Sequence, residues 1–448
     1  MSTFSMGGVH PHDYKEFSAH KPIVDCPLPK KATVLLAQHI GAPAVPVVEK
    51  GDKVLVGQLL AKAGGFVSAN VSSPVSGTVT KIDSIVDSSG LRTPAIFIDV
   101  EGDEWMPEID RTPEIKRDCT LEPKAIVDKI AEAGIVGLGG ACFPTHVKLL
   151  PPPGKKAEVL IVNGVECEPY LTNDHQLMLE HGEEILVGIQ IVMKALGINR
   201  AIIGIEKNKP DAIKHMQELA DKVLGVEVKS LKVKYPQGGE KQLIDACIRR
   251  QVPSGALPIE VGAVVDNVAT LFAIYEAVQK NKPLIDRVMT VTGKHMEKAG
   301  NYRVRFGTPI SEIINFAGGI PEDTGKIIAG GPMMGRAVSN LEAMPANKRL
   351  SALLFMPESE SRRPEPSNCI RCAKCVDACP MGLEPYLLAK MSARQDWDGM
   401  EKHDVMDCIE CGCCLFTCPS NRPLLDYVRL GKGKVGANIR ARQAVKKG

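Results

Sequence analysis

Residues 134–148 read GIVGLGGACFPTHVK, with four glycines in the first seven positions and a phenylalanine, a proline and a lysine close behind. The segment nearly matches the dinucleotide fingerprint G-x-G-x-x-G, but Cys142 stands where the last glycine belongs. Backbone without side chains can approach a flat ring or a phosphate closely, and Lys148 offers a positive charge nearby. The segment therefore predicts a cofactor loop, although glycines in such a place also form simple turns.

A helix is predicted immediately before these glycines, over the stretch TLEPKAIVDKIAEAG. Thr120 is its expected N-cap, Ile126, Ile130 and Ala133 recur at helical spacing, and Gly134 is expected to end it. A Rossmann fingerprint must follow a strand and open a helix. Because these glycines follow a helix, the sequence argues against that fingerprint.

Strand-like and helical stretches alternate from about residue 121 to 280, which predicts an α/β sheet. The strand-like stretches are AEVLIVNG, AIIGIE, VEVKSLKVKY and GAVVDN. Ligands of α/β sheets bind at the carboxyl ends of the strands. Polar and glycine residues stand at those ends or just beyond them: Asn163, Glu166, Glu168, Tyr235, Gly238, Gly239, Glu240, Asp266 and Asn267.

Four further units are expected around this sheet. Residues 1–112 read as short strands and turns, and VVEKGDKVLVGQLL followed by SSPVSGTV resembles the barrel-sandwich hybrid of biotinyl and lipoyl carriers, with Phe66 in place of the modifiable lysine. The expected ranges are 1–112 for this barrel, 121–285 for the α/β unit, 286–355 for a compact α+β unit, 365–425 for a cysteine-rich unit on short helices and 426–448 for a basic tail.

Nine of the fourteen cysteines lie between Cys369 and Cys418, in two runs of the form C-x2-C-x2-C-x3-C-P. Such runs hold two [4Fe-4S] clusters, with the fourth cysteine of each run ligating the other cluster. The predicted ligands of the first cluster are Cys369, Cys372, Cys375 and Cys418, and those of the second are Cys408, Cys411, Cys414 and Cys379. A pair of zinc sites is the alternative, but zinc prefers two-cysteine knuckles. Cys413, inside the second run, is expected to be a buried packing residue.

Composition narrows the class of function. A net charge of +2 and only 4% aromatic residues give neither a broad basic field nor many stacking platforms, so no nucleic-acid partner is expected. Uncharged stretches are too short to span a bilayer, and the N-terminus does not resemble a signal peptide, so a cytosolic protein is expected. Thiols stay reduced there, which favours metal ligation over disulfides.

Four motifs, GLGGACFPTHVK, NGVECEP, GGE and DNVATL, resemble the flavin-binding motifs of the flavin subunit of respiratory complex I. Together with the N-terminal GGVHPHDYKEF, the barrel and the two cysteine runs, they resemble the C subunits of Rnf complexes, ion-translocating ferredoxin:NAD oxidoreductases. The resemblance covers nearly the whole chain. It also implies that the unit at 286–355 is a β-grasp domain of the soluble-ligand-binding type.

The resemblance implies cofactor and substrate contacts at named positions. Implied FMN contacts are Gly137, Gly139, Gly140, Lys148, Asn163, Glu166, Tyr235, Gly238, Asp266 and Asn267. Implied NAD(H) contacts are Phe143, which would stack on the nicotinamide, and Glu168 and Glu240, which would accept from ribose hydroxyls, with Gly239 in the same loop. Leu138 and Val165 depart from the complex I motif, where an arginine and an acidic residue stand. Cys142 and Cys167 are expected to pack, and His146 to lie in a turn.

The implied function is hydride exchange between NAD(H) and FMN, followed by single-electron transfer through the two clusters to or from other Rnf subunits. This would link NAD and, indirectly, ferredoxin to ion transport at the cytoplasmic face of the membrane. An NADH-dependent corrinoid reductase and a non-catalytic electron relay are the alternatives. The basic tail is expected to be a disordered end, with contact to anionic lipid as its alternative.

Overall fold

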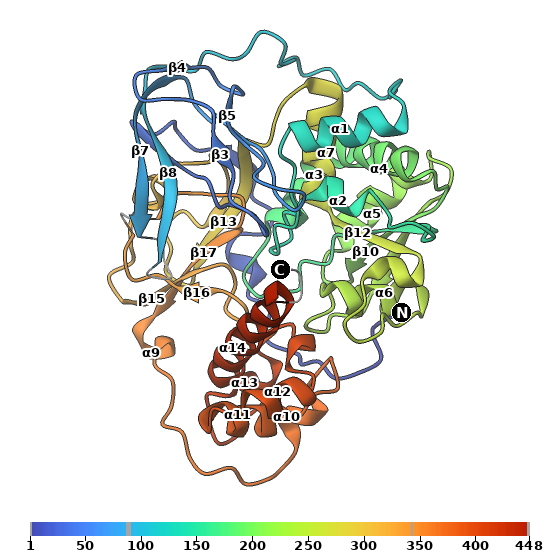
Figure 1. The fold of residues 1–448 in the computed structure, drawn as a ribbon, viewed down its shortest axis with the longest axis vertical. Coiled ribbons are helices and arrows are strands. Elements are labelled where there is room, and N and C mark those ends of the chain that lie inside the picture. Colours follow the sequence, from blue (N-terminus) through green and yellow to red (C-terminus); the bar gives the residue numbers. More distant parts are fainter. Residues whose placement is uncertain (1, 87–90, 342–343, 446–448) are drawn as a thin grey trace.

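The computed structural model describes residues 2–86, 91–341 and 344–445 (Figure 1). Its strands form four sheets, and a helical unit follows them at the C-terminal end of the chain. Figure 1 shows the barrel strands on one side, the α/β unit on the other and the helical unit below both. The predicted multidomain α/β and α+β fold class is confirmed.

The α/β unit contains a four-stranded parallel sheet in the order β11-β10-β9-β12. Its strands are β9 (Val159–Asn163), β10 (Ala201–Glu206), β11 (Val226–Leu231) and β12 (Ala263–Asn267). Strands β9, β10 and β12 are largely apolar and almost wholly buried, as expected for a parallel sheet that is covered on both faces. Parallel pairing brings the carboxyl ends of β9 and β12 side by side, so Asn163 and Asn267 are register partners.

Seven helices accompany this sheet. They are α1 (Pro123–Glu132), α2 (Thr145–Lys148), α3 (Asn173–Glu180), α4 (Gly182–Leu196), α5 (Pro210–Ala220), α6 (Glu240–Ile248) and α7 (Val268–Lys280). One face of the sheet packs on a core that includes Ile130 of α1, Ile189 of α4 and Leu271 of α7. The other face packs on Leu243 and Ile244 of α6. The loops at the carboxyl ends of the strands remain available for ligands.

The helix that precedes the glycine loop begins later than the sequence predicts. Its N-cap is Glu122, not Thr120, and Pro123 occupies the first helical position. Proline favours that position because its fixed φ suits a helix and its missing N–H is not needed there. Gly134 ends the helix as predicted, with φ +66°, and the N–H of Ile135 donates to the Ile130 carbonyl.

The barrel contains two antiparallel sheets, in the orders β2-β8-β7-β4 and β3-β5-β6. Their strands are β2 (Lys31–Leu35), β3 (Val45–Pro46), β4 (Lys53–Val54), β5 (Leu59–Lys62), β6 (Val71–Ser72), β7 (Gly77–Val86) and β8 (Arg92–Val100). Leu60, Val79, Ile96 and Ile98 are fully buried between the sheets. This arrangement matches the predicted carrier-like sandwich.

Residues 2–25 lie outside this sandwich and connect the other units. Ser2 pairs with Leu231 and Val9 pairs with Tyr235, both beyond the barrel in the α/β unit. After the short helix η1 (Lys15–Phe17), strand β1 (Ile23–Asp25) joins the edge of a six-stranded sheet, parallel to β14.

That six-stranded sheet has the order β1-β14-β13-β17-β15-β16. Its other members are β13 (Asp286–Gly293), β14 (Gly300–Arg305), β15 (Thr324–Ala329), β16 (Arg336–Ala337) and β17 (Ala352–Pro357). Helix α8 (Ile310–Phe316) packs Ile310, Ile313 and Ile314 on Met289 and Leu353 of the sheet. This α+β unit follows the 3-10 helix η2 (Pro258–Val261) and α7 in the chain.

The cysteine runs lie on and between short helices. After α9 (Glu358–Ser361) come α10 (Lys374–Asp377), α11 (Pro385–Ala393), α12 (Trp397–Lys402), η3 (Val405–Asp407), α13 (Cys413–Phe416) and α14 (Leu424–Val445). Cys375 lies on α10 and Cys413 and Cys414 lie on α13, whereas the other cysteines of the runs lie in the connecting loops and not on helices as predicted. None of the helices in the described ranges is long and apolar enough to cross a membrane.

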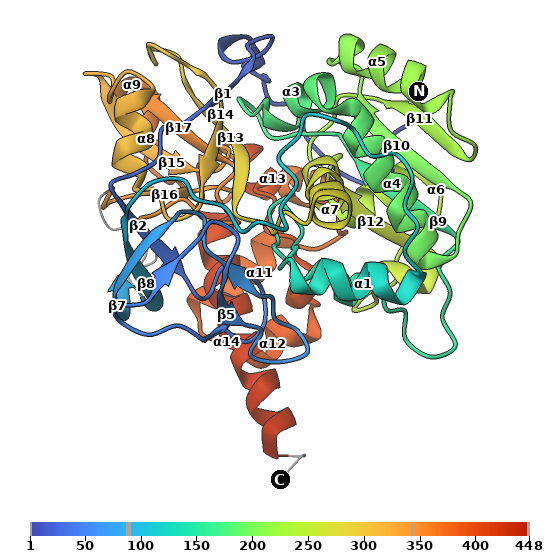
Figure 2. The same ribbon diagram turned by 90° about the horizontal axis from the view of Figure 1, so that it is seen from above.

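The expectation of a disordered basic tail is wrong, because helix α14 extends through Val445 (Figure 2). Its first half packs on the cysteine-rich unit through Leu424, Val428 and Val435, which are buried at helical spacing. Three glycines in the helix argue against helicity from propensity alone. Packing overrides that preference: the β-carbon of any residue replacing Gly431 would lie 2.2 Å from Cε of the buried Met400, so Met400 would have to shift to admit a side chain there.

A matched pair of substitutions tests this packing. We expect Gly431→Ala to destabilise the protein by about 1–3 kcal/mol, because the added methyl group displaces Met400 from a filled core. Gly433→Ala meets no atom within 4 Å and should instead stabilise α14 by up to about 1 kcal/mol. Thermal unfolding measured by circular dichroism distinguishes the two, and equal effects would contradict the described contact.

Candidate functional site

The glycine run forms a closed loop between α1 and α2. The N–H of Gly137 donates to the Phe143 carbonyl (2.9 Å), the N–H of Cys142 donates to the Gly137 carbonyl (3.1 Å), and Val136 pairs with Pro144. Gly140 has φ +123° and no atom within 4 Å of where a β-carbon would stand. The loop therefore presents exposed backbone with open space beside it.

One side of this loop faces the end of strand β12. A β-carbon on Gly139 would lie 3.2 Å from Cβ of Asn267, closer than side chains ordinarily pack. Asn267 itself caps α7, because its Oδ1 accepts from the Ala269 N–H (2.9 Å), while its Nδ2 donates to Asp174 (2.6 Å). A flat group entering beside Gly139 and Gly140 would thus meet a fixed polar wall.

Asp266, next to Asn267, is a buried carboxylate whose two oxygens both lack a hydrogen-bond partner. Its closest cation is Lys148, whose Nζ lies 3.6 Å from Oδ1 and donates instead to the Val265 carbonyl (2.8 Å). Burial raises the pKa of Asp266 to about 6, with Glu240 adding to the rise and Lys148 opposing it. An acceptor left unpaired in this way suits a ligand with N–H or O–H donors, as FMN has.

Four other predicted residues lie at the end of β9 and the start of α6. Asn163 Nδ2 donates to the Gly238 carbonyl (2.9 Å), which joins the end of β9 to the turn before α6. Gly239 is the N-cap of α6, and Glu240 is its first residue, with its Oε1 3.7 Å from Lys148 Nζ. The structure brings Gly139, Lys148, Asn163, Asp266 and Asn267 together.

The Glu166 carboxylate lies at the start of helix α3. It accepts from the N–H groups of Asp174 (2.6 Å) and His175 (3.3 Å), at the N-terminus of α3. Lys15 Nζ is 4.0 Å from the same carboxylate. In the described structure Glu166 therefore caps a helix and anchors the N-terminal segment.

Glu168 lies at a junction of three units. Its oxygens accept from the N–H groups of Met333 (3.1 Å) and Met334 (2.8 Å), in the loop between β15 and β16, and from Tyr235 Oη at 3.4 Å. The Tyr235 hydroxyl also donates to the carbonyl of Cys411 (2.8 Å) in the cysteine-rich unit. Glu168 and Tyr235 thus join the flavin-motif loops to the second cysteine run.

Burial raises the pKa of Glu168 from 4.5 to about 7, against the opposing effect of the Met333 and Met334 N–H groups. The folded protein therefore binds a proton that the unfolded chain releases near pH 4.5, so this group's contribution to stability is complete below pH 4.5 and is lost as pH rises through 7. We expect the thermal unfolding midpoint of the wild-type protein to fall as the pH is raised from 5 to 8. In Glu168→Gln the fall should be smaller, and the difference should correspond to about 3 kcal/mol in the free energy of unfolding. Identical pH profiles would contradict the raised pKa.

The remaining candidates of this region have structural roles. Burial raises the pKa of the Cys142 and Cys167 thiols, as expected for packing residues. Phe143 follows the glycine loop and is half-buried. His146 does not lie in a turn as predicted, because it belongs to α2, whose N-cap is Pro144. Burial lowers the pKa of His146, and the nearby backbone of Phe66 opposes that shift.

Sequence reasoning missed Asp174, which holds Asn267 in place and whose pKa burial raises to about 7. The polar stretch TNDHQ, buried at the start of α3, was the available signal. It also missed the N-terminal segment, where Gly8 donates to the Ala378 carbonyl (3.0 Å) and Val9 pairs with Tyr235.

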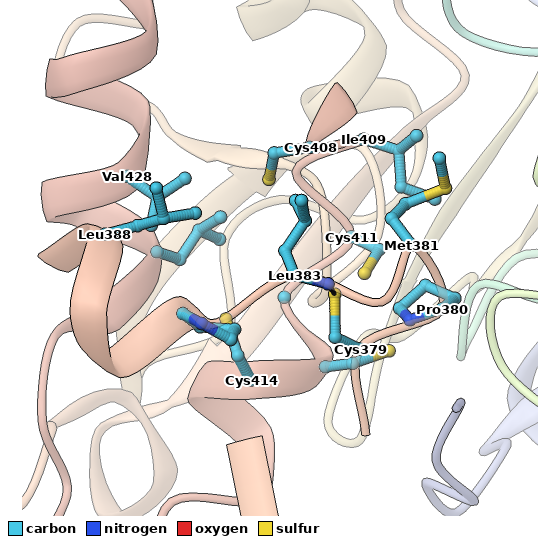
Figure 3. Close-up of a pocket in the computed structure, with 14 residues that line it drawn as sticks. Cys379, Pro380, Met381, Leu383, Leu388, Cys408, Ile409, Cys411, Cys414 and Val428 are labelled. Carbon is cyan, nitrogen blue, oxygen red and sulfur yellow. Dashed lines mark hydrogen bonds between the residues drawn. The ribbon is translucent and has the colours of Figure 1, made fainter. Parts of the chain in front are cut away.

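The cysteines of the second predicted set surround one pocket. Cys379, Cys408, Cys411 and Cys414 line it together with Leu383, Leu388 and Val428 (Figure 3). Burial raises the pKa of Cys408 to about 11, and the neighbouring Cys411 and Cys379 raise it further. Cys413 lines the same pocket but is fully buried, with its Sγ 3.9 Å from the Tyr235 carbonyl.

The first predicted set lies at the surface. Cys369 and Cys372 are exposed in the loop before α10, and Cys375 and Cys418 are half-buried. Burial raises the pKa of the Cys375 thiol, and the nearby Cys418 and Cys369 raise it further. The predicted exchange of fourth ligands between the two runs stays a prediction, which the proximity of Cys418 to Cys375 favours.

The lining of the pocket around the second set of cysteines fits a cubane cluster. A zinc site needs its ligands around a single centre, whereas each cysteine of a [4Fe-4S] cluster binds a different iron at a corner of the cube. Four thiols around an apolar pocket fit the cluster.

Protein-family models match the barrel, the α/β unit, the α+β unit and the cysteine-rich unit. Residues 3–103 match the RnfC barrel sandwich hybrid domain, 130–276 the Nuo51 FMN-binding domain, 288–337 the SLBB domain and 362–421 the 4Fe-4S dicluster domain. The C subunit of the proton-translocating ferredoxin:NAD(+) oxidoreductase complex of Clostridium ljungdahlii is 45% identical over 430 residues, covering 96% of this chain and 93% of that protein.

The chain belongs to the family of Rnf complex C subunits. The C subunit of the Na(+)-translocating ferredoxin:NAD(+) oxidoreductase complex of Acetobacterium woodii is 42% identical and covers 97% of both chains. The C subunit of the ion-translocating oxidoreductase complex of Rhodobacter capsulatus is 41% identical over 97% of this chain and 84% of that protein. As a member of this RnfC family, the chain is part of an ion-translocating oxidoreductase, with FMN and [4Fe-4S] clusters as cofactors.

Among solved structures, the NAD+-reducing [NiFe]-hydrogenase in its H2-reduced state matches with a TM-score of 0.50 and 17% identity, over 73% of this chain and 67% of that chain. This likeness concerns the fold alone. Membership of the RnfC family also removes the corrinoid reductase as an alternative, because the N-terminal barrel belongs to the RnfC family model.

Proposed function

We propose that this chain exchanges hydride with NAD(H) at the glycine loop and passes single electrons to the cysteine-rich unit. Bound FMN supplies the conversion between the two-electron and one-electron chemistry. The observation that carries the proposal is the hydrogen bond from Tyr235 to the Cys411 carbonyl, because it joins a flavin-motif loop directly to a cluster-binding cysteine. Relatives named as parts of ferredoxin:NAD(+) oxidoreductase complexes support the choice of NAD(H).

The site residues have distinct proposed roles. Gly137, Gly139 and Gly140 admit the isoalloxazine ring, Asp266 accepts from its polar edge or from the ribityl hydroxyls, and Lys148 contributes positive charge. Asn163, Asn267 and Gly238 hold the wall in shape, supported by their mutual hydrogen bonds and by Asp174. Glu166 positions α3 and the N-terminal segment.

For the nicotinamide substrate, we propose that Phe143 stacks on its ring and that Glu240, on the exposed side of α6, accepts from a ribose hydroxyl. In this structure the Glu168 carboxylate accepts hydrogen bonds from the N–H groups of Met333 and Met334. Glu168 can contact the substrate only after these hydrogen bonds break. Gly239 keeps the start of α6 close to the loop. The domain limits proposed for these functions are 1–112, 121–285, 286–355, 365–425 and 426–448.

The two clusters have an order in this proposal. Cys379, Cys408, Cys411 and Cys414 would hold the cluster nearer to the flavin-motif loops, because Cys411 is buried and its carbonyl accepts from the Tyr235 hydroxyl. The cluster of Cys369, Cys372, Cys375 and Cys418 exchanges electrons with a partner protein, because its loop is exposed. Other Rnf subunits thus keep the chain at the cytoplasmic face of the membrane and connect it indirectly to ferredoxin.

The exposed loop offers a testable contact for a one-electron partner. Ile370 is 67% exposed between the cysteines, and neither Arg371 nor Lys374 forms an ion pair in the described part of the chain. We expect Arg371→Glu with Lys374→Glu to slow electron transfer to an acidic two-cluster ferredoxin about tenfold at low salt. The double variant Lys50→Glu with Lys222→Glu, on distant exposed lysines, should leave the rate unchanged; equal rates in all three proteins would contradict this docking face.

Anaerobic titration with NADH tests the proposed function. The purified chain should retain FMN after desalting, and NADH should bleach the flavin absorbance. Retained flavin that NADH does not bleach would contradict hydride exchange at this site. Clusters without stoichiometric flavin would favour the electron-relay alternative.

A further inference from the structure

Residues 4–9, which we name the N-terminal strap, lie between a flavin-motif loop and the cysteine-rich unit. On one side the N–H of Val9 donates to the Tyr235 carbonyl (2.8 Å), and the N–H of Tyr235 donates to the Val9 carbonyl (2.9 Å). On the other side the N–H of Gly8 donates to the carbonyl of Ala378 (3.0 Å), which precedes a proposed cluster ligand. The strap thus hydrogen-bonds both partners of the proposed electron transfer.

Two consecutive glycines fit the strap between these neighbours. Gly7 has φ +64°, and a β-carbon on it would lie 2.5 Å from the carbonyl carbon and oxygen of Cys379. Gly8 has φ +92°, and a β-carbon on it would lie 2.8 Å from the Tyr235 carbonyl oxygen. The left-handed backbone itself also favours glycine. The strap is therefore in direct backbone contact with both units, and a side chain at Gly7 would push it away from the cysteine-rich unit.

The first residues of the strap are anchored in the α/β unit. Phe4 is buried beneath Lys234, whose Nζ lies 4.1 Å from the ring centroid, and its N–H donates to Gln237 Oε1 (3.3 Å). The N–H and the hydroxyl of Ser5 both donate to one carboxylate oxygen of Asp245 on α6 (2.7 and 2.8 Å). These anchors fix the two glycines that follow, so the strap presents a fixed surface to the cysteine-rich unit.

The strap also enlarges the interface between the two units. Beyond it they meet through isolated hydrogen bonds, such as the one from Gln242 Nε2 to the Pro380 carbonyl (3.2 Å), and the chain that enters the cysteine-rich unit, residues 362–368, is exposed. Domains of one chain move relative to each other unless their interface is large and apolar. Val9 adds apolar area, because it is buried in a cluster that also contains Cys411. The strap therefore restrains the cysteine-rich unit.

We propose that the N-terminal strap positions the cluster of the second cysteine set against the flavin-motif loops, and thereby sets the rate of electron transfer between flavin and cluster. In this step the reduced flavin loses one electron and the oxidised cluster gains it. The inference rests on the proposed function and extends it by naming a positioning element that contains no cysteine and supplies no thiolate to either cluster.

Gly7→Ala is the discriminating variant, measured in the full-length, cofactor-loaded chain. To reach an ordinary contact of 3.4 Å, its β-carbon must push the Cys379 backbone away by about 1 Å. We expect the flavin-to-cluster step, followed by freeze-quench electron paramagnetic resonance after mixing with NADH, to slow about tenfold, since a misplacement of about 1 Å can cost up to a hundredfold in rate. NADH should bleach the flavin at the wild-type rate. Iron content and the resonance spectrum of the dithionite-reduced clusters should be unchanged.

Gly197→Ala is the matched control. Gly197 has nearly the same φ, +65°, but a β-carbon there meets no atom within 4 Å. This variant should leave both rates unchanged. Phe4→Leu shortens the anchor without adding atoms against the cysteine-rich unit, and it should slow the same step by a smaller factor. It keeps the inference testable if Gly7→Ala does not fold.

Three results would overturn the inference. The first is an unchanged flavin-to-cluster rate in folded Gly7→Ala, or in Phe4→Leu if Gly7→Ala does not fold. The second is equal slowing in Gly197→Ala, which would show a general effect of backbone strain. The third is loss of iron from Gly7→Ala, which would assign the strap to cluster assembly. Wild-type flavin that NADH does not bleach would overturn the proposed function alone, because light-driven reduction of the flavin would still measure its electron transfer to the cluster in each variant.

Discussion

Replacing Gly139 with valine should leave the folded protein nearly free of FMN. A β-carbon at this position already lies 3.2 Å from Cβ of Asn267, and the two methyl groups of valine would extend into the space beside the loop. Asn267 cannot give way easily, because its side chain caps α7 and donates to Asp174. We expect flavin content to fall from about one per chain to below about a tenth, since a preformed concave site tolerates little added volume.

Gly433→Val is the matched control, because a β-carbon there meets no atom within 4 Å and the position lies on α14. It should retain the wild-type flavin content. Flavin is measured by absorbance after desalting, and circular dichroism checks that both variants fold. Full flavin content in Gly139→Val would mean that FMN does not bind beside this glycine.

Replacing Cys414 with serine should remove one whole cluster. Cys414 lines the pocket together with Cys379, Cys408 and Cys411, and the loss of one thiolate leaves one iron of the cube without its ligand. Iron content should fall from about eight to about four per chain. NADH should still bleach the flavin, but electron transfer to an external one-electron acceptor protein should fall at least about a hundredfold.

Cys413→Ser supplies the control from the neighbouring position. Cys413 is fully buried and lies against the Tyr235 carbonyl, so the substitution keeps the size of a packing residue and leaves all four proposed ligands in the chain. Iron content should stay near the wild-type value. If iron were instead lost in Cys413→Ser and kept in Cys414→Ser, the third ligand of the second run would be Cys413 and not Cys414.

The sequence predicts those features that depend on local pattern. The cysteine spacing, the glycine-terminated helix before the loop and the apolar strands of the α/β sheet each follow from short-range rules, and the structure agrees with them. Parallel strands carry their ends to one edge, so Asn163 and Asn267 become neighbours although 104 residues separate them.

Features that depend on contacts between units could not be read in this way. Glu168 resembles a substrate contact in sequence, yet the Met333–Met334 loop, far along the chain, engages its carboxylate. Tyr235 belongs to a flavin motif in sequence, yet its hydroxyl donates a hydrogen bond to the Cys411 carbonyl in the cysteine-rich unit. The glycines of α14 argue against a helix until Met400 is known to pack on Gly431. In each case a tertiary contact outweighs the local preference.

Rapid freeze-quench electron paramagnetic resonance after mixing with NADH tests the central claim most directly. In the wild-type chain, flavin bleaching should be followed within the same turnover by the signal of a reduced [4Fe-4S] cluster. In Cys414→Ser the flavin should bleach equally fast, while the remaining cluster, held by the first set of cysteines, stays oxidised. Reduction of that remaining cluster at the wild-type rate would contradict a route that runs from the flavin through the cluster beside Tyr235.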